Sequence, residues 1–70
     1  MNADEVNRIT ELWSKLAQEP VHVEMIHDRI YGICNELAAL RLEHQYKGCN
    51  RAKAFFSKPL NSWCFALTPL

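Results

Sequence analysis

The chain has 70 residues, of which 49% are hydrophobic, with eight Lys and Arg balancing eight Asp and Glu. This length allows a single domain, and the hydrophobic fraction excludes a disordered chain. A domain of this size buries only about 60% of the surface that its unfolded chain exposes. We therefore expect one small domain, residues 1–70, with an apolar patch that a partner covers.

The zero net charge hides an uneven distribution. Residues 1–40 carry seven acidic and three basic side chains, whereas residues 41–58 carry five basic side chains and one acidic side chain, Glu43. Two such halves attract each other when they lie side by side. Alternatively, the basic half binds an external polyanion.

Three cysteines, Cys34, Cys49 and Cys64, form neither an even set nor a metal-binding spacing. This pattern indicates free thiols in a reducing compartment. The first residues lack the cationic start and apolar run of a signal peptide, and no apolar stretch is long enough to span a bilayer. We expect a cytoplasmic protein that does not contact a membrane.

A first helix is expected from about residue 3 to residue 18. Asn2 is a favourable N-cap, and Glu5 stands at the capping-box position. Pro20 ends the helix, because it disfavours helical geometry at the preceding residue. Its buried stripe recurs at every third or fourth residue: Val6, Ile9, Trp13 and Leu16.

A second, longer helix is expected over about residues 21–47, ending before Gly48. An apolar seam recurs along it at alternating steps of three and four: Val23, Ile26, Ile30, Ile33, Leu37 and Leu40. Because the shorter first helix cannot cover this surface, we expect these six residues to form a homodimer. Gly32, in the middle of this segment, indicates a close crossing by another helix or by the ring of Trp13.

The remainder of the chain predicts a short helix over about residues 51–57 and an apolar tail over residues 59–70. The tail either folds back over the second helix or docks on a partner. The predicted fold class is therefore all-α: an antiparallel helical hairpin with a long second helix, a short third helix and an apolar C-terminal tail.

No residue pattern indicates catalysis or a cofactor. The two glycines cannot form a phosphate-cradling loop, and no nucleophile has an identifiable base beside it. His22, Glu24 and His27 have a spacing found in di-iron helix bundles, but they lie at the start of the predicted second helix. We interpret them as solvated residues and expect neither a metal site nor enzyme activity.

We expect instead a small protein-interaction module, a regulator or inhibitor that sterically blocks a partner protein. Aromatic residues and arginine dominate interface hot spots. The expected partner-binding residues are Tyr31, Arg41, Tyr46, Arg51, Trp63 and Phe65. Two alternatives stay open: a nucleic-acid-binding protein that uses the basic and aromatic segment 46–58, and a structural subunit of a larger assembly.

Three segments, Glu-Leu-Trp at 11–13, His-Asp-Arg-Ile-Tyr at 27–31 and Leu-Ala-Ala-Leu at 37–40, carry a resemblance. They resemble the small helical host-takeover proteins of Pseudomonas phages, of the quorum-sensing anti-activator type. In that family a helical hairpin dimerises and blocks host regulators or the type IV pilus assembly ATPase. The resemblance implies a phage-encoded inhibitor, and the chain departs from the family pattern from Gly48 onward.

Overall fold

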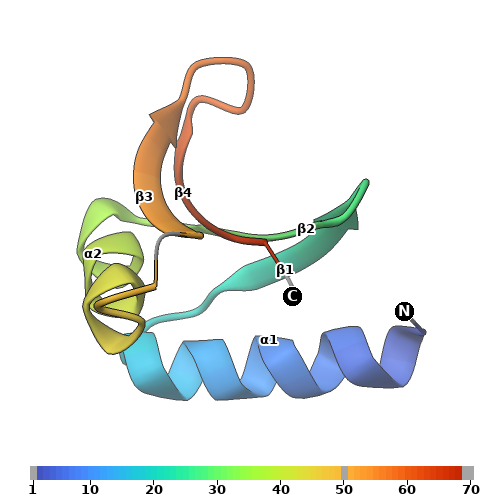
Figure 1. Ribbon diagram of the computed structural model, residues 1–70. Coiled ribbons are helices and arrows are strands. Elements are labelled where there is room, and N and C mark those ends of the chain that lie inside the picture. The colour runs from blue at the N-terminus through green and yellow to red at the C-terminus, as the bar shows by residue number, and fades with distance from the viewer. Residues whose placement is uncertain (1, 50, 69–70) are drawn as a thin grey trace.

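The computed structural model describes residues 2–49 and 51–68 (Figure 1). Two helices and four strands follow one another in the order α1 (Ala3–Ala17), β1 (His22–Ile26), β2 (Arg29–Cys34), α2 (Glu36–Gln45), β3 (Ala52–Ser57) and β4 (Ser62–Leu67). The fold class is α+β, so the predicted all-α class and helical hairpin are wrong. The helical hairpin that the phage-protein resemblance implied is absent from the described residues as well.

The four strands form one antiparallel sheet in the order β1-β2-β4-β3. Two hairpins, β1–β2 and β3–β4, meet where β2 pairs with β4. Both helices lie against the same face of this sheet, and the β3–β4 hairpin curves away from α1 (Figure 1). The opposite face is therefore concave and is covered by neither of the two described helices, and we call it the open face.

The first predicted helix is confirmed. α1 runs over Ala3–Ala17, and the Oδ1 atom of Asn2 accepts a hydrogen bond from the backbone N–H of Glu5 at 2.9 Å. Gln18 ends the helix in a left-handed conformation, with φ of 57°. Arg41 stabilises this end further, because its guanidinium donates to the carbonyl of Ala17 at 2.8 Å.

The predicted second helix over residues 21–47 is wrong, because its first half forms the β1–β2 hairpin. Residues 21–33 are rich in valine and isoleucine, which fit a pleated and half-buried surface. Only Glu36–Gln45 is helical, and it begins where Oδ1 of Asn35 accepts from the N–H of Ala38 at 2.8 Å. The apolar steps of three and four therefore span two strands and a helix and make no helical seam for a homodimer.

The predicted helix over residues 51–57 is strand β3, and the predicted tail over residues 59–70 contains strand β4. The side chains of β3 alternate between the two faces, because a strand repeats every two residues. β4 pairs with β2 on one side and with β3 on the other, so this part of the tail folds back as a central strand. Residues 69 and 70 lie outside the described residues.

β3 is an edge strand of the sheet, and two of its backbone N–H groups form hydrogen bonds with residues outside the sheet. The Oε2 atom of Glu43 on α2 accepts a hydrogen bond from the N–H of Ala54 at 2.7 Å. The N–H of Ala52 donates to the carbonyl of Cys49 at 3.2 Å. Two donors of this edge strand are therefore satisfied within the chain.

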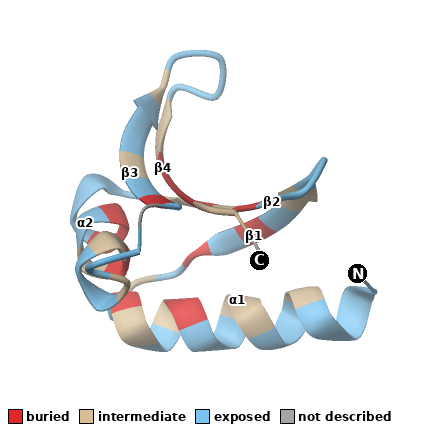
Figure 2. Cartoon of the chain, viewed as in Figure 1, coloured by how far each residue is buried: buried red, intermediate tan, exposed pale blue. Residues whose placement is uncertain are grey.

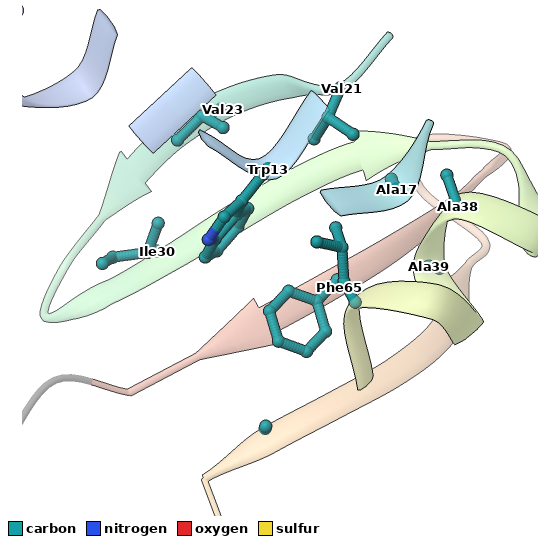
Figure 3. Close-up of a cluster of buried hydrophobic side chains, with 10 residues drawn as sticks. Trp13, Ala17, Val21, Val23, Ile30, Ala38, Ala39 and Phe65 are labelled. Carbon is teal, nitrogen blue, oxygen red and sulfur yellow. The ribbon is translucent and has the colours of Figure 1, made fainter. Parts of the chain in front are cut away.

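The core lies between the helices and the sheet (Figures 2 and 3). Its centre is Trp13, which is 1% exposed and lies over β2 at Gly32. A Cβ atom at Gly32 would lie 2.8 Å from Cε3 of Trp13 and 2.9 Å from Cγ1 of Val21. The prediction that Gly32 allows a close approach of the Trp13 ring is confirmed. Ala38 and Ala39 are fully buried, so α2 packs through small side chains.

An aromatic cluster joins both helices to β4. The rings of Trp13 and Phe65 meet edge to face at 5.0 Å, and Tyr46 stacks on Phe65 at 5.4 Å. The indole N–H of Trp13 donates to the hydroxyl of Tyr46 at 3.1 Å. This bond satisfies the one polar group that Trp13 brings into the core.

We expect Gly32→Ala to lower the free energy of unfolding by about 1–3 kcal/mol, because the new methyl group overlaps the Trp13 ring. Urea denaturation measures the change. In the Trp13→Phe background, whose smaller ring leaves room, the same substitution should cost less. Equal costs in the two backgrounds would contradict the proposed close contact.

We expect Tyr46→Phe to lower the free energy of unfolding by about 1–3 kcal/mol, because it leaves the buried indole N–H of Trp13 without its acceptor. Tyr31→Phe, which removes a hydroxyl on the other face of the sheet, is the matched control. Urea denaturation of both variants should show the larger loss for Tyr46→Phe.

Candidate functional site

The open face carries a mixture of basic, aromatic and small side chains. The register of the strands and the alternation along each strand place them in rows across the sheet. One row runs from Tyr31 through Ala66 to Lys53, and the next runs from Ile33 through Cys64 to Phe55. In each row a small residue of β4 lies between larger residues of β2 and β3.

Ala66 lies at the floor of a hollow in this face, which we call the β4 trench. Cys64 and Ala66 are buried, whereas Phe55 on the neighbouring strand is 37% exposed. The hollow has a volume of about 570 Å³. Its lining includes Arg29, Arg51, Lys53, Phe55, Ala66 and Thr68.

The β4 trench has a positive lining. Arg29, Arg51 and Lys53 lie around it, and no acidic side chain of the described residues lines it. The N–H of Thr68 donates to the carbonyl of Arg51 at 3.2 Å, which extends the β3–β4 pairing to this end of the trench. Glu24, on the far strand of the open face, contacts Nε2 of His22 at 3.2 Å. The trench therefore favours an anionic ligand.

The thiols near the sheet are poor nucleophiles. Burial raises the pKa of Cys64 above its usual value. Burial, and then the charges of Cys64 and Glu19, raise the pKa of Cys34 to about 11. A nucleophilic cysteine needs a lowered pKa, so neither thiol is activated for catalysis.

A second hollow, of about 440 Å³, lies at the C-terminal end of α2. Its lining includes Leu40, His44, Lys47 and Cys49. Across residues 2–49 and 51–68, no three His, Cys, Asp or Glu side chains are grouped so that they could hold a metal ion. The lining of this hollow also includes the acidic Glu43, so it lacks the positive character of the β4 trench.

The structure brings two of the six expected partner-binding residues to the open face. Tyr31 lies beside Ala66 in the register, and Arg51 lines the β4 trench itself. Phe65, on β4, points away from the open face into the core, where it is fully buried.

The other three expected partner-binding residues make contacts within the fold. Tyr46 accepts the hydrogen bond from Trp13, and Arg41 binds the end of α1. Trp63 lies on the helix-facing side of β4 and meets Phe56 edge to face at 6.1 Å. These side chains stabilise the domain.

The six residues expected to form a dimer seam are divided among several surfaces. Val23 and Ile30 are buried in the core, and Ile33 is half-buried on the open face. The remaining three are exposed: Ile26 on β1, and Leu37 and Leu40 on α2. The structure does not bring the six together.

Of the residues that line the β4 trench, only Arg51 was among the expected partner-binding residues. The other six were missing: Arg29, Lys53, Ala54, Phe55, Ala66 and Thr68. Lys53 and Phe55 lie in the basic and aromatic segment 46–58, and their spacing of two places them on one face of a strand. Arg29 and Ala66 join them only through the pairing of β2 with β4. Reading the segment with a period of two would have placed Arg51, Lys53 and Phe55 on one face.

We expect the folded protein to lose stability as the pH rises from about 9 to 11. In the unfolded chain Cys34 ionises near its usual pKa of 9.0, whereas in the fold it holds its proton up to a pKa of about 11. The unfolded state therefore releases this proton first, and the free energy of unfolding falls. Urea denaturation across this pH range under reducing conditions should show a shallower fall for Cys34→Ser.

No described helix combines the length and the apolar character needed to cross a membrane. Comparisons of the chain with models of protein families, with curated proteins and with solved structures gave no match. The geometry of the site is therefore the basis for assigning a function.

Proposed function

We propose that this protein is a non-catalytic binding module that holds a nucleic acid on the open face of its sheet. The observation that carries the proposal is the β4 trench, whose described lining contains Arg29, Arg51 and Lys53 and no acidic side chain. Nucleic-acid binding draws most of its affinity from cations placed against phosphates. Although the net charge of the chain is zero, three of its eight Lys and Arg residues line this one hollow.

The aromatic residue in the same hollow supports a nucleic acid over other polyanions. Phe55 keeps more than a third of its surface exposed, although it is large and apolar. It is two residues from Lys53 on the same face of β3. Alternating cations and aromatic rings match the alternating phosphates and bases of a nucleic acid.

A role as an inhibitor or regulator that blocks a partner protein, with self-association, is a second proposal. Leu37 and Leu40 favour it, because they lie one turn apart on α2 and are both about half exposed. Exposed apolar side chains on neighbouring turns of a helix are typical of protein contacts. We also propose a cytoplasmic location, which agrees with the three free thiols Cys34, Cys49 and Cys64.

The test of nucleic-acid binding is fluorescence anisotropy with a labelled oligonucleotide at several salt concentrations. We expect binding that weakens with salt, with a log–log slope of about −2 if roughly three phosphates are contacted. Arg29→Glu combined with Lys53→Glu should reduce the affinity at least about tenfold.

The matched control is Arg8→Glu combined with Lys15→Glu, which makes the same change in net charge on α1, away from the open face. This control should bind nearly as well as the natural sequence. An equal loss in both double variants would mean that net charge alone matters, and the absence of binding at low salt would refute the proposal.

A further inference from the structure

We infer that the β4 trench holds a single strand of nucleic acid, with one base stacked on Phe55, and that it discriminates against a duplex. This inference rests on the proposed function and specifies its ligand. It follows from the shape of the open face, from the position of Phe55 and from the depth of the trench.

The width of the trench suits one strand. Neighbouring strands of a sheet lie about 4.8 Å apart, so the side chains of β2 and β3 that flank β4 are separated by roughly 10 Å. The open face is also concave, because the β3–β4 hairpin curves away from the helices (Figure 1). The convex surface of a nucleic-acid duplex would rest on the side chains that flank the trench. A single extended strand of nucleic acid can reach the floor of the trench at Ala66.

The end of the β3–β4 hairpin is a less suitable binding site for a nucleic-acid duplex than its shape suggests. A two-stranded ribbon can enter the major groove, and the end of the β3–β4 hairpin has that shape. Its turn, residues 58–61, carries a single cation, Lys58, beside Pro59 and the exposed Leu60. The three cations Arg29, Arg51 and Lys53 lie in the trench.

Phe55 is positioned to stack on a base inside the trench. It faces the open side of β3, and the neighbouring residue of its row, Cys64, is buried. Lys53 lies on the same face of the same strand, one step closer to Arg51. A base on the ring of Phe55 therefore brings its own phosphate towards these cations.

The volume of the hollow, about 570 Å³, falls within the range of about 300–1,000 Å³ that is typical of small-ligand sites. The small side chain of Ala66 keeps this space open. Because every base has an aromatic face, stacking on Phe55 gives little preference for sequence. We therefore expect general single-strand binding to DNA or RNA.

The experiment compares the affinities of the whole protein for a labelled thymine oligonucleotide, for an RNA single strand of the same length and for a duplex of that length. We expect at least one single strand to bind at least about tenfold more tightly than the duplex. All three oligonucleotides are measured at one low salt concentration, so that contacts between cations and phosphates contribute strongly to each affinity.

Two neighbouring residues provide a matched pair of variants. Phe55→Ala should weaken single-strand binding at least about fivefold, the lower end of the loss of one stacked base. Phe56→Ala removes a ring of the same size, which is also exposed, from the other face of the same strand and should leave binding unchanged. Phe55→Trp, which keeps an aromatic ring, should retain binding.

Ala66→Leu tests the depth of the trench without changing its charge, and it should reduce single-strand binding at least about tenfold while the variant stays folded by circular dichroism. If that variant does not fold, the comparison of Phe55→Ala with Phe56→Ala tests the inference on its own. Equal binding of duplex and single strands, or equal effects of Phe55→Ala and Phe56→Ala, would overturn this inference and leave the proposed function standing. Failure of every oligonucleotide to bind would overturn both.

Discussion

The contact between Trp13 and Gly32 sets the distance between α1 and the sheet. The indole fills the space that a side chain at Gly32 would need, and its N–H is bonded to Tyr46 beyond the C-terminal end of α2. One side chain thus fixes α1, β2 and the end of α2 relative to one another. In a domain this small, with a core built around one indole, the helices have a single way to cover the sheet.

The same arrangement determines what the other face can do. Because both helices pack on one side, β4 directs Phe65 into the core and places its neighbours Cys64 and Ala66 on the open face. The small side chain of Ala66 leaves room for the β4 trench, and residues of the flanking strands supply its charged and aromatic walls. The binding surface is therefore a product of side-chain alternation along a central strand.

The sequence correctly predicted the helix that depends on local signals. It did not predict the strands, which depend on pairing between residues far apart in the chain. The cap at Asn2 and the stripe around Trp13 predicted α1 correctly. Apolar residues of 23–33 recur at steps of three and four, as in Val23, Ile26 and Ile30, and also at a step of two, as in Val23 and Met25. Only the pairing between strands distinguishes a strand from a helix here. Lys53 and Phe55 lay within a segment noted for its basic and aromatic character, whereas Arg29 joins them only in the folded sheet.

Because of the carboxylate of Glu43, the two edges of the sheet differ in how readily they can pair with an additional β-strand. This carboxylate accepts a hydrogen bond from the N–H of Ala54, so the edge at β3 offers an incomplete template for another strand. Within the described residues, no side chain of α2 bonds to the edge at β1 in this way. A second copy that adds its own β1 to this edge would close a twofold pair and leave two β3 edges outside. Strand addition would then stop at two chains instead of propagating as a fibre.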